Sequence, residues 1–171
     1  VASARQQDAG RGSANDPAKR FVTFVDERGE RANLHYGAAL FRFERGNVIT
    51  PHGHRYMVSA HLVLDGELRV RTFDRAGEDG DALLLRDGRD GIARRGDVST
   101  MSPTRRNVHW FVPRGAAATT FDVVVSDLEP GRKSFEIQPV DILRATSLRD
   151  GTLRAPVIGF AESSERYTAR V

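Results

Sequence analysis

The strongest constraint on the fold is a series of short apolar runs separated by turn-forming dipeptides. From Phe21 onward, runs of five to nine residues rich in Val, Leu, Phe and Thr follow one another at close spacing. Such runs are typical of β-strands, and no alternation of strand and helix patterns indicates a parallel sheet. We therefore expect an all-β sandwich or barrel with strands near 21–25, 39–44, 56–64, 67–73, 82–86, 97–101, 108–112 and 119–125.

Glycine-containing dipeptides between the runs predict where the chain reverses. Asp65-Gly66 separates two runs and predicts a tight hairpin, because such turns need residues that tolerate positive φ. Asp87-Gly88 with Asp90-Gly91 predicts a second reversal, and Arg114-Gly115 predicts a third.

The length of 171 residues fits one domain with a hydrophobic core. Residues 1–18 are polar and small and lack apolar periodicity, so we expect a mobile, disordered N-terminal arm ahead of a single domain over 19–171. After Pro130-Gly131 the pattern loosens, which predicts a short irregular or helical C-terminal extension on the outside.

Composition excludes several functional classes. The chain has no cysteine, so a metal site must use His and carboxylates. The net charge is +3, but basic residues are spread among 23 acidic ones, and we expect no nucleic-acid partner. No apolar run approaches the roughly 18 residues of a membrane span, so we expect no membrane partner. The compartment is open between cytoplasm and export after loss of a signal peptide, and we expect a monomer or homodimer.

Histidines carry the most specific chemical signal. His52 and His54 stand at i and i+2 in TPHGHRY, which places both rings on one face of an extended segment. His109 lies in another predicted strand, and distant strands of a barrel line one interior. Three imidazoles with open positions suit a first-row transition metal, whereas a surface pair of histidines is the alternative.

Two segments around these histidines resemble the cupin motifs. GNVITPHGHRYMVSAHLVLDG (46–66) resembles the first motif, and GDVSTMSPTRRNVH (96–109) resembles the second in looser form. The resemblance covers about 38–126 and implies a cupin-type jelly-roll β-barrel. It also implies that His52, His54 and His109 are metal ligands.

One departure from the motif narrows the resemblance. Many cupins have a glutamate ligand where this chain has Ser59, so the site resembles a three-histidine one. Such sites are typical of thiol dioxygenases, and the cysteamine dioxygenase and plant cysteine oxidase branch is the most similar. The similarity rests on Thr72-Phe73-Asp74, on Asn107 to Phe111 and on Phe121-Asp122-Val123. It implies Fe(II) as cofactor, with Mn, Ni or Zn as alternatives.

The resemblance implies an oxidoreductase, a non-haem Fe(II)-dependent dioxygenase. We expect it to oxidise a small thiol or an N-terminal cysteine of a peptide to a sulfinate with O2. The family's Pro-Pro-Tyr segment is replaced by Ser126-Asp127-Leu128. Two alternatives therefore stay open, namely a three-histidine dioxygenase acting on a carbon substrate and a non-catalytic cupin that binds a metal or small molecule.

Further residues are candidates for roles around the metal. Asp122 and Tyr56 are candidate catalytic residues, Asp122 as partner of a substrate amine or a ligand ring and Tyr56 at the pocket mouth. Trp110 is a second candidate for the mouth. His61 could be a fourth ligand, a base beside the ligands or a buried polar residue.

Two arginines are candidates for substrate binding. Arg55 and Arg71 could each bind a substrate carboxylate with two hydrogen bonds. Solvent-exposed positions are the alternative for both arginines and for Asp122.

Overall fold

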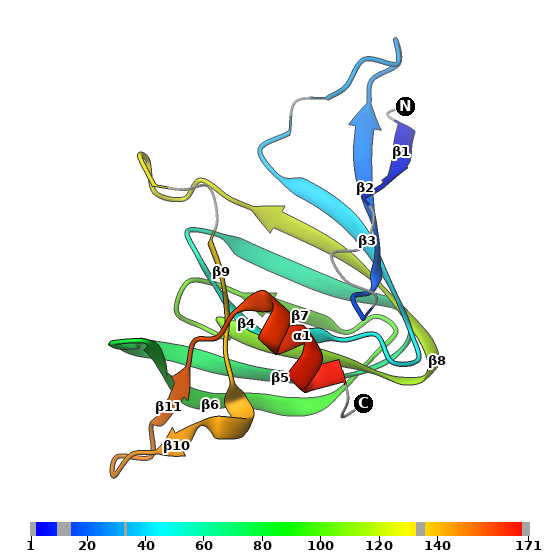
Figure 1. Ribbon diagram of the computed structural model, residues 1–171. Helices are drawn as coiled ribbons and strands as arrows, with labels where there is room; N and C mark the ends of the chain where they lie inside the picture. Colours follow the sequence, from blue (N-terminus) through cyan, green and yellow to red (C-terminus); the bar gives the residue numbers. More distant parts are fainter. Residues whose placement is uncertain (1–2, 10–14, 33, 133–135, 169–171) are drawn as a thin grey trace.

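The fold is built almost entirely from antiparallel strands (Figure 1). The computed structural model describes residues 3–9, 15–32, 34–132 and 136–168. Its strands are β1 Ser3–Asp8, β2 Ala18–Val25, β3 Gly37–Glu44, β4 Ile49–Arg55, β5 Val58–Asp79, β6 Ala82–Arg94, β7 Val98–Met101, β8 Val108–Val125, β9 Glu136–Pro139, β10 Thr146–Ser147 and β11 Leu153–Pro156. A 3₁₀ turn, η1 Ile142–Arg144, and a helix, α1 Phe160–Thr168, complete the described elements.

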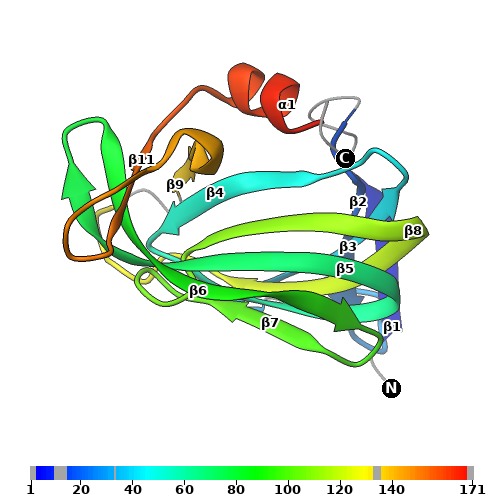
Figure 2. The same cartoon turned by 90° about the horizontal axis from the view of Figure 1, so that it is seen from below.

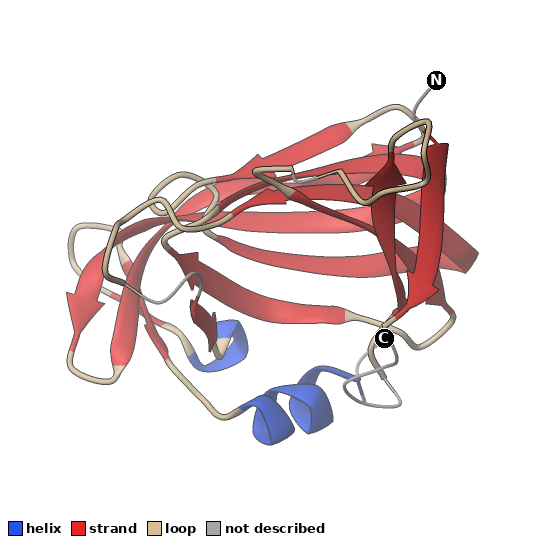
Figure 3. Ribbon diagram, turned by 90° about the horizontal axis from the view of Figure 1, so that it is seen from above, coloured by secondary structure: helices blue, strands red, loops and turns tan. Residues whose placement is uncertain are grey.

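The long strands β5 and β8 organise the barrel. β5 pairs with β8, β6 and β7, and β8 also pairs with β3 and β4. Figure 2 shows β4, β8, β5 and β6 running side by side, and Figure 3 shows α1 and η1 together beside the strands. The prediction of an all-β barrel with a short helical C-terminal extension is confirmed.

The predicted reversals at Asp65-Gly66 and Arg114-Gly115 are wrong. Both dipeptides lie inside continuous strands, β5 and β8, and the pairing register between these strands shifts around Asp65. Gly66 has a φ of 73°, and a Cβ there would stand 2.3 Å from the carbonyl oxygen of Ala117. These glycines therefore bend two paired strands together at a bulge, which needs the same backbone freedom as a turn.

The reversal predicted at Asp87-Gly88 and Asp90-Gly91 is also wrong, because β6 continues through both dipeptides. A Cβ on Gly88 would lie 2.7 Å from the carbonyl oxygen of Thr72, so glycine is needed here for close strand approach. The actual hairpin between β5 and β6 is the two-residue loop Gly80-Asp81, where Gly80 has a φ of 60°.

Two apolar clusters fill the space between the strands. One contains Phe43, Val63, Leu68, Val70, Ala93, Phe111 and Ala118, and the other contains Phe73, Leu83, Leu85, Val108, Val140 and Ala155. The first cluster includes Phe111 of β8, and the second includes Val108 of the same strand. Residues before and after His109 on β8 therefore pack into two separate apolar clusters, which hold this segment of the strand in place.

The N-terminal segment forms strand β1. β1 pairs with β2 from Ser3↔Val25 to Asp8↔Arg20. Residues 1–2 and 10–14 of the expected arm lie outside the described residues. That the arm over 1–18 moves in solution stays a prediction, as does the single domain over 19–171. No helix of the described residues is long and apolar enough to cross a membrane.

A buried carboxylate anchors α1 to the barrel. Asp141 is fully buried and accepts a hydrogen bond of 3.1 Å from the hydroxyl of Tyr167, and it also forms an ion pair with Arg166. Tyr167 is fully buried against Trp110 of β8, with ring centroids 5.0 Å apart. The helix is therefore fixed to the strand that carries His109.

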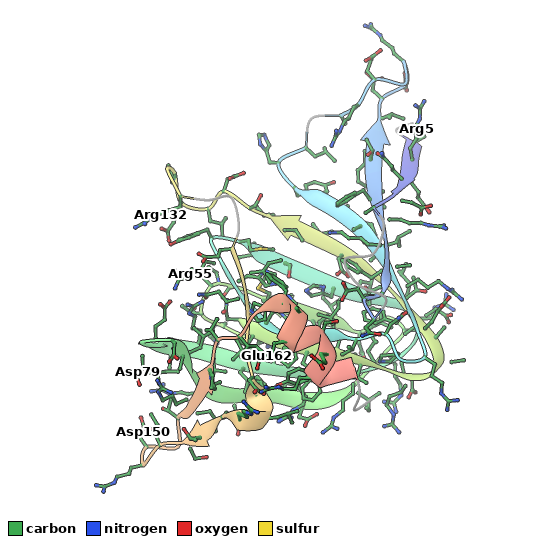
Figure 4. The ribbon with its side chains drawn as sticks, in the orientation of Figure 1. Arg5, Arg55, Asp79, Arg132, Asp150 and Glu162 are labelled. Atoms are coloured by element: carbon green, nitrogen blue, oxygen red, sulfur yellow. The ribbon has the colours of Figure 1, made fainter. Side chains whose placement is uncertain are left out.

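Substituting Asp141 with Ala should lower the free energy of unfolding by about 2–4 kcal/mol, because buried Tyr167 and partly buried Arg166 lose their acceptor. Glu162→Gln is a matched control, since Glu162 is an exposed partner of the same Arg166 on α1 (Figure 4). That control should change stability by less than about 0.5 kcal/mol. Urea denaturation measures both, and equal effects of the two variants would contradict the anchoring role.

Candidate metal centre

Pairing between β4 and β8 brings the predicted histidines together. His52 lies directly opposite His109 across these antiparallel strands, and His54 follows two residues later on the same face of β4. Asn107 supports this arrangement by donating from its side-chain amide to the carbonyl oxygens of His54 at 2.7 Å and Ser102 at 2.8 Å. Gly53 permits it, because a Cβ there would stand 2.7 Å from Oδ1 of Asn107.

The three imidazoles form one compact group. Ring centroids lie 4.5 Å apart for His52 and His54, 4.4 Å for His52 and His109, and 5.1 Å for His54 and His109. One nitrogen of each ring lies within 4.8 Å of the corresponding nitrogens of the other two. His54 and His109 are buried, whereas His52 is partly exposed to the adjoining cavity.

Burial keeps all three imidazoles neutral. Desolvation lowers the pKa of His52 to about 4, and it lowers the pKa values of His54 and His109 well below their usual range. The neighbouring imidazoles lower all three further. Nδ1 of His52 donates to the carbonyl oxygen of Thr50 at 2.7 Å, which leaves the Nε2 lone pair available.

This donor set fits a divalent transition metal. Neutral imidazole is a preferred ligand for Zn, Cu, Fe and Ni, and a metal must bind the deprotonated ring. Nδ1 of His54 and Nδ1 of His109 are buried without a hydrogen-bond partner among the described residues. Two adjacent buried rings that each have an unpartnered nitrogen are costly, and an ion shared by the three imidazoles would offset part of that cost.

His61 is committed to other partners. Its Nδ1 lies 2.7 Å from Oδ2 of Asp122, the residue directly across from it on β8, and its Nε2 lies 2.8 Å from Oγ of Ser59. Both contacts are of hydrogen-bond length, with a carboxylate oxygen on one side of the ring and a hydroxyl oxygen on the other. Both nitrogens are therefore occupied, although the His61 ring stands only 5.3 Å from that of His109.

A cavity of about 610 Å³ opens beside the three histidines. His52, His54, His61, His109 and Asp122 all line it. Its other walls are mainly apolar and come from β2, β3, β4, β8, β9, α1 and the turn after β4. They include Phe21, Ala38, Ala39, Phe41, Ile49, Met57, Val124, Ile137 and Phe160. The one Lys or Arg among the described lining residues is Lys19.

The sequence analysis missed Lys19 and the aromatic residues at the cavity edge. Lys19 and Phe21 stand two residues apart in a strand-like run, which is the only local signal that they share a face. The face of β2 that carries Lys19 and Phe21 lies near the histidines only because β2 pairs with β3 and β3 pairs with β8. No local pattern contains this information.

Four predicted site residues lie away from this cavity. Arg55 pairs with Glu78 and with Glu136, and Figure 4 shows it at the periphery of the barrel. Tyr56 occupies the turn after β4 with a φ of 60°, beside Arg55.

The other two are neighbours on β5 and β8. Arg71 pairs with Asp90 at 3.1 Å, and its guanidinium stands 5.5 Å from the ring centroid of Trp110. Trp110 itself packs on Tyr167. The substrate roles predicted for Arg55, Arg71, Tyr56 and Trp110 stay predictions.

Comparison with known proteins gives a fold assignment. No protein-family model matches the chain, and no curated protein matches it. CapF, solved with an inhibitor, matches at a TM-score of 0.51 with 10% identity over 77% of this chain and 34% of that one. Procruciferin, an 11S globulin of Brassica napus, matches at 0.50 with 9% identity over 77% and 29%. An RmlC-like cupin from Shewanella frigidimarina matches at 0.46 with 16% identity over 70% and 81%.

The fold is a jelly-roll β-barrel whose strands are arranged as in CapF and procruciferin. At these identities the likeness concerns the arrangement of strands alone. The resemblance to the cysteamine dioxygenase and plant cysteine oxidase branch stays a prediction.

Replacing any one of the three histidines with Ala should weaken binding of Zn²⁺ or Fe²⁺ by more than about 100-fold, since even loss of a partner behind a ligand costs about 10–100-fold. His61→Gln should leave one ion bound per chain and weaken binding less than loss of a ligand does. Titration calorimetry on the metal-free protein measures this. Equal losses for His61→Gln and His109→Ala would contradict a three-histidine set.

The metal-free protein should lose stability as the pH falls from about 6.5 to about 4. In that window the unfolded chain protonates its histidines while folded His52 stays neutral, so the unfolded state binds more protons and is favoured. We expect a loss of about 1–3 kcal/mol, with little change from this group above pH 6.5.

Denaturation at several pH values measures that loss. His52→Gln should show a shallower pH dependence than the parent chain. His35→Gln is the control, because His35 is exposed, and it should retain the parent dependence. If the stability of His52→Gln fell with pH as steeply as that of the parent chain, the lowered pKa would not belong to His52.

Proposed function

We propose that this protein is a metal-dependent dioxygenase that oxidises a small organic thiol to a sulfinate with O2. The observation that carries the proposal is the set of three neutral imidazoles beside a cavity, without a carboxylate among the ligands. Ser59, which stands where a glutamate ligand is expected, is hydrogen-bonded to His61.

His52, His54 and His109 would hold Fe(II). When bound, this ion would supply a redox centre beside the cavity. Because the ligands are neutral, the full charge of the ion is available to favour a thiolate over a thiol. The overall reaction converts a thiol and one O2 to a sulfinic acid, so its atoms balance without a further reductant.

The protein's own groups orient the ligands and limit water. The bond from His52 to the carbonyl oxygen of Thr50 fixes which nitrogen faces the site. The Ser59-His61-Asp122 chain of hydrogen bonds fixes the ring beside His109 and occupies polar groups that would otherwise bind water. Apolar walls such as Ile49, Met57 and Val124 exclude water from the rest of the cavity.

A carbon substrate is the second candidate. No tyrosine is among the described residues that line the cavity, whereas the thiol dioxygenase branch resembled by the sequence carries one in its Pro-Pro-Tyr segment. The largely apolar lining also suits a carbon skeleton. This second reading uses the same three histidines.

The protein loaded with Fe(II) under anaerobic conditions should consume O2 when cysteamine, cysteine or a peptide with N-terminal cysteine is added. Oxygen uptake and mass spectrometry should show equal amounts of O2 consumed and sulfinate formed. His109→Ala and the Zn²⁺-loaded protein should show neither, because one lacks a ligand and the other lacks a redox-active ion.

Absence of thiol-dependent uptake in the iron-loaded protein would overturn the thiol reading. Uptake with a diketone or phenol instead would favour the carbon substrate. Metal binding without uptake for either class would indicate a non-catalytic cupin.

A further inference from the structure

Lys19 is the one lysine or arginine among the described residues that line the cavity. It lies on β2, where Lys19 and Phe21 alternate with residues of the other face, and both line the cavity together with Pro17 just before the strand. Its partner across the sheet is Phe41 on β3, which lines the cavity as well. A positive charge is thus built into the wall that shares the cavity with the histidines.

The Lys19 ammonium lies among aromatic rings without a carboxylate partner. Its Nζ stands 4.6 Å from the ring centroid of Phe21 and 5.3 Å from that of Phe41. No carboxylate of the described residues lies within 4.0 Å of it. Burial lowers the pKa of Lys19, while the charge of Asp122 opposes that effect.

Neither acidic residue among the described lining residues forms an ion pair with Lys19. Asp122 is bonded to His61, and Asp16 has an interaction partner of its own. A partly desolvated ammonium gains most from a charged acceptor that enters with the ligand. Cation–π contacts with two phenylalanines stabilise the charge by only about 0.5–2 kcal/mol.

The edge of the cavity exposes large aromatic side chains. Phe160 at the start of α1 is 64% exposed, and Phe21 is 47% exposed. Together with Phe41 and Ile49 they form an apolar wall next to the ammonium. Exposed apolar side chains gathered at one cavity indicate a binding surface.

We infer that the cavity binds a small organic anion whose carboxylate pairs with Lys19 and whose apolar body lies against Phe21, Phe41 and Phe160. This inference rests on the proposed function for the identity of the reactive end, which would lie at His52, His54 and His109. The pairing of a carboxylate with Lys19, here called the anchor, depends on the cavity alone and not on the oxidation. Lys19 would therefore select a negatively charged substrate within this cavity.

Hexanoate and its neutral counterpart hexanamide are suitable probes, because they differ at the group that Lys19 would recognise. Titration calorimetry should be done on the full chain in metal-free form, where direct ligation of a metal by the carboxylate is impossible. We expect hexanoate to bind at least about tenfold more tightly than hexanamide. Lys19→Met should abolish that difference, and Lys19→Arg should retain part of it.

Arg20→Met is the matched control. Arg20 is the next residue of β2, points to the opposite face and pairs with exposed Asp8. The Arg20→Met variant should bind hexanoate more tightly than hexanamide, as the parent chain does. Circular dichroism and thermal denaturation establish that both Met variants fold, and Lys19→Met should be at least as stable as the parent because it removes a partly buried charge.

Three outcomes would overturn the anchor. They are equal binding of the two probes by the parent chain, an unchanged preference in Lys19→Met, and no binding of either probe. A Lys19-dependent preference without thiol-dependent oxygen uptake would support the anchor and refute the proposed oxidation. Thiol oxidation that is unaffected by Lys19→Met would support the proposed oxidation and refute the carboxylate anchor at Lys19.

Discussion

The register between β4 and β8 is the constraint on which the candidate site depends. It sets His52 directly opposite His109, and the two-residue period of an extended strand then adds His54 on the same face. A shift of one residue would turn both β4 histidines away from the interior. Several features hold this register, including the amide of Asn107, the absence of a side chain at Gly53 and the apolar clusters on either side of His109.

A second register, between β5 and β8, decides the role of the fourth histidine. It places His61 opposite Asp122, and the short hydrogen bonds on both ring nitrogens satisfy a group that would be costly to bury alone. The same carboxylate acts on Lys19 through its charge. The cavity therefore combines three neutral imidazoles from β4 and β8, a hydrogen-bonded chain from β5 and β8, and one cation from β2.

The sequence predicted those features that depend on local spacing. The His-x-His period and the cupin motif spacing were sufficient to bring His52, His54 and His109 together, and the strand runs were sufficient for an all-β barrel. The reversals at Asp65-Gly66 and Arg114-Gly115 could not be distinguished from bulges, because both structures need glycine at positive φ. Lys19 and the bond between His61 and Asp122 depend on pairing between distant strands, which no local pattern specifies.

X-ray absorption spectroscopy of the Zn²⁺-loaded protein tests the three-histidine centre most directly, because it counts the imidazoles around the ion. We expect three imidazole nitrogens at about 2.0–2.1 Å, with the remaining positions taken by lighter, non-imidazole ligands. A fourth imidazole would mean that His61 leaves Asp122 and Ser59 to bind the ion. Fewer than three would contradict a centre formed by His52, His54 and His109.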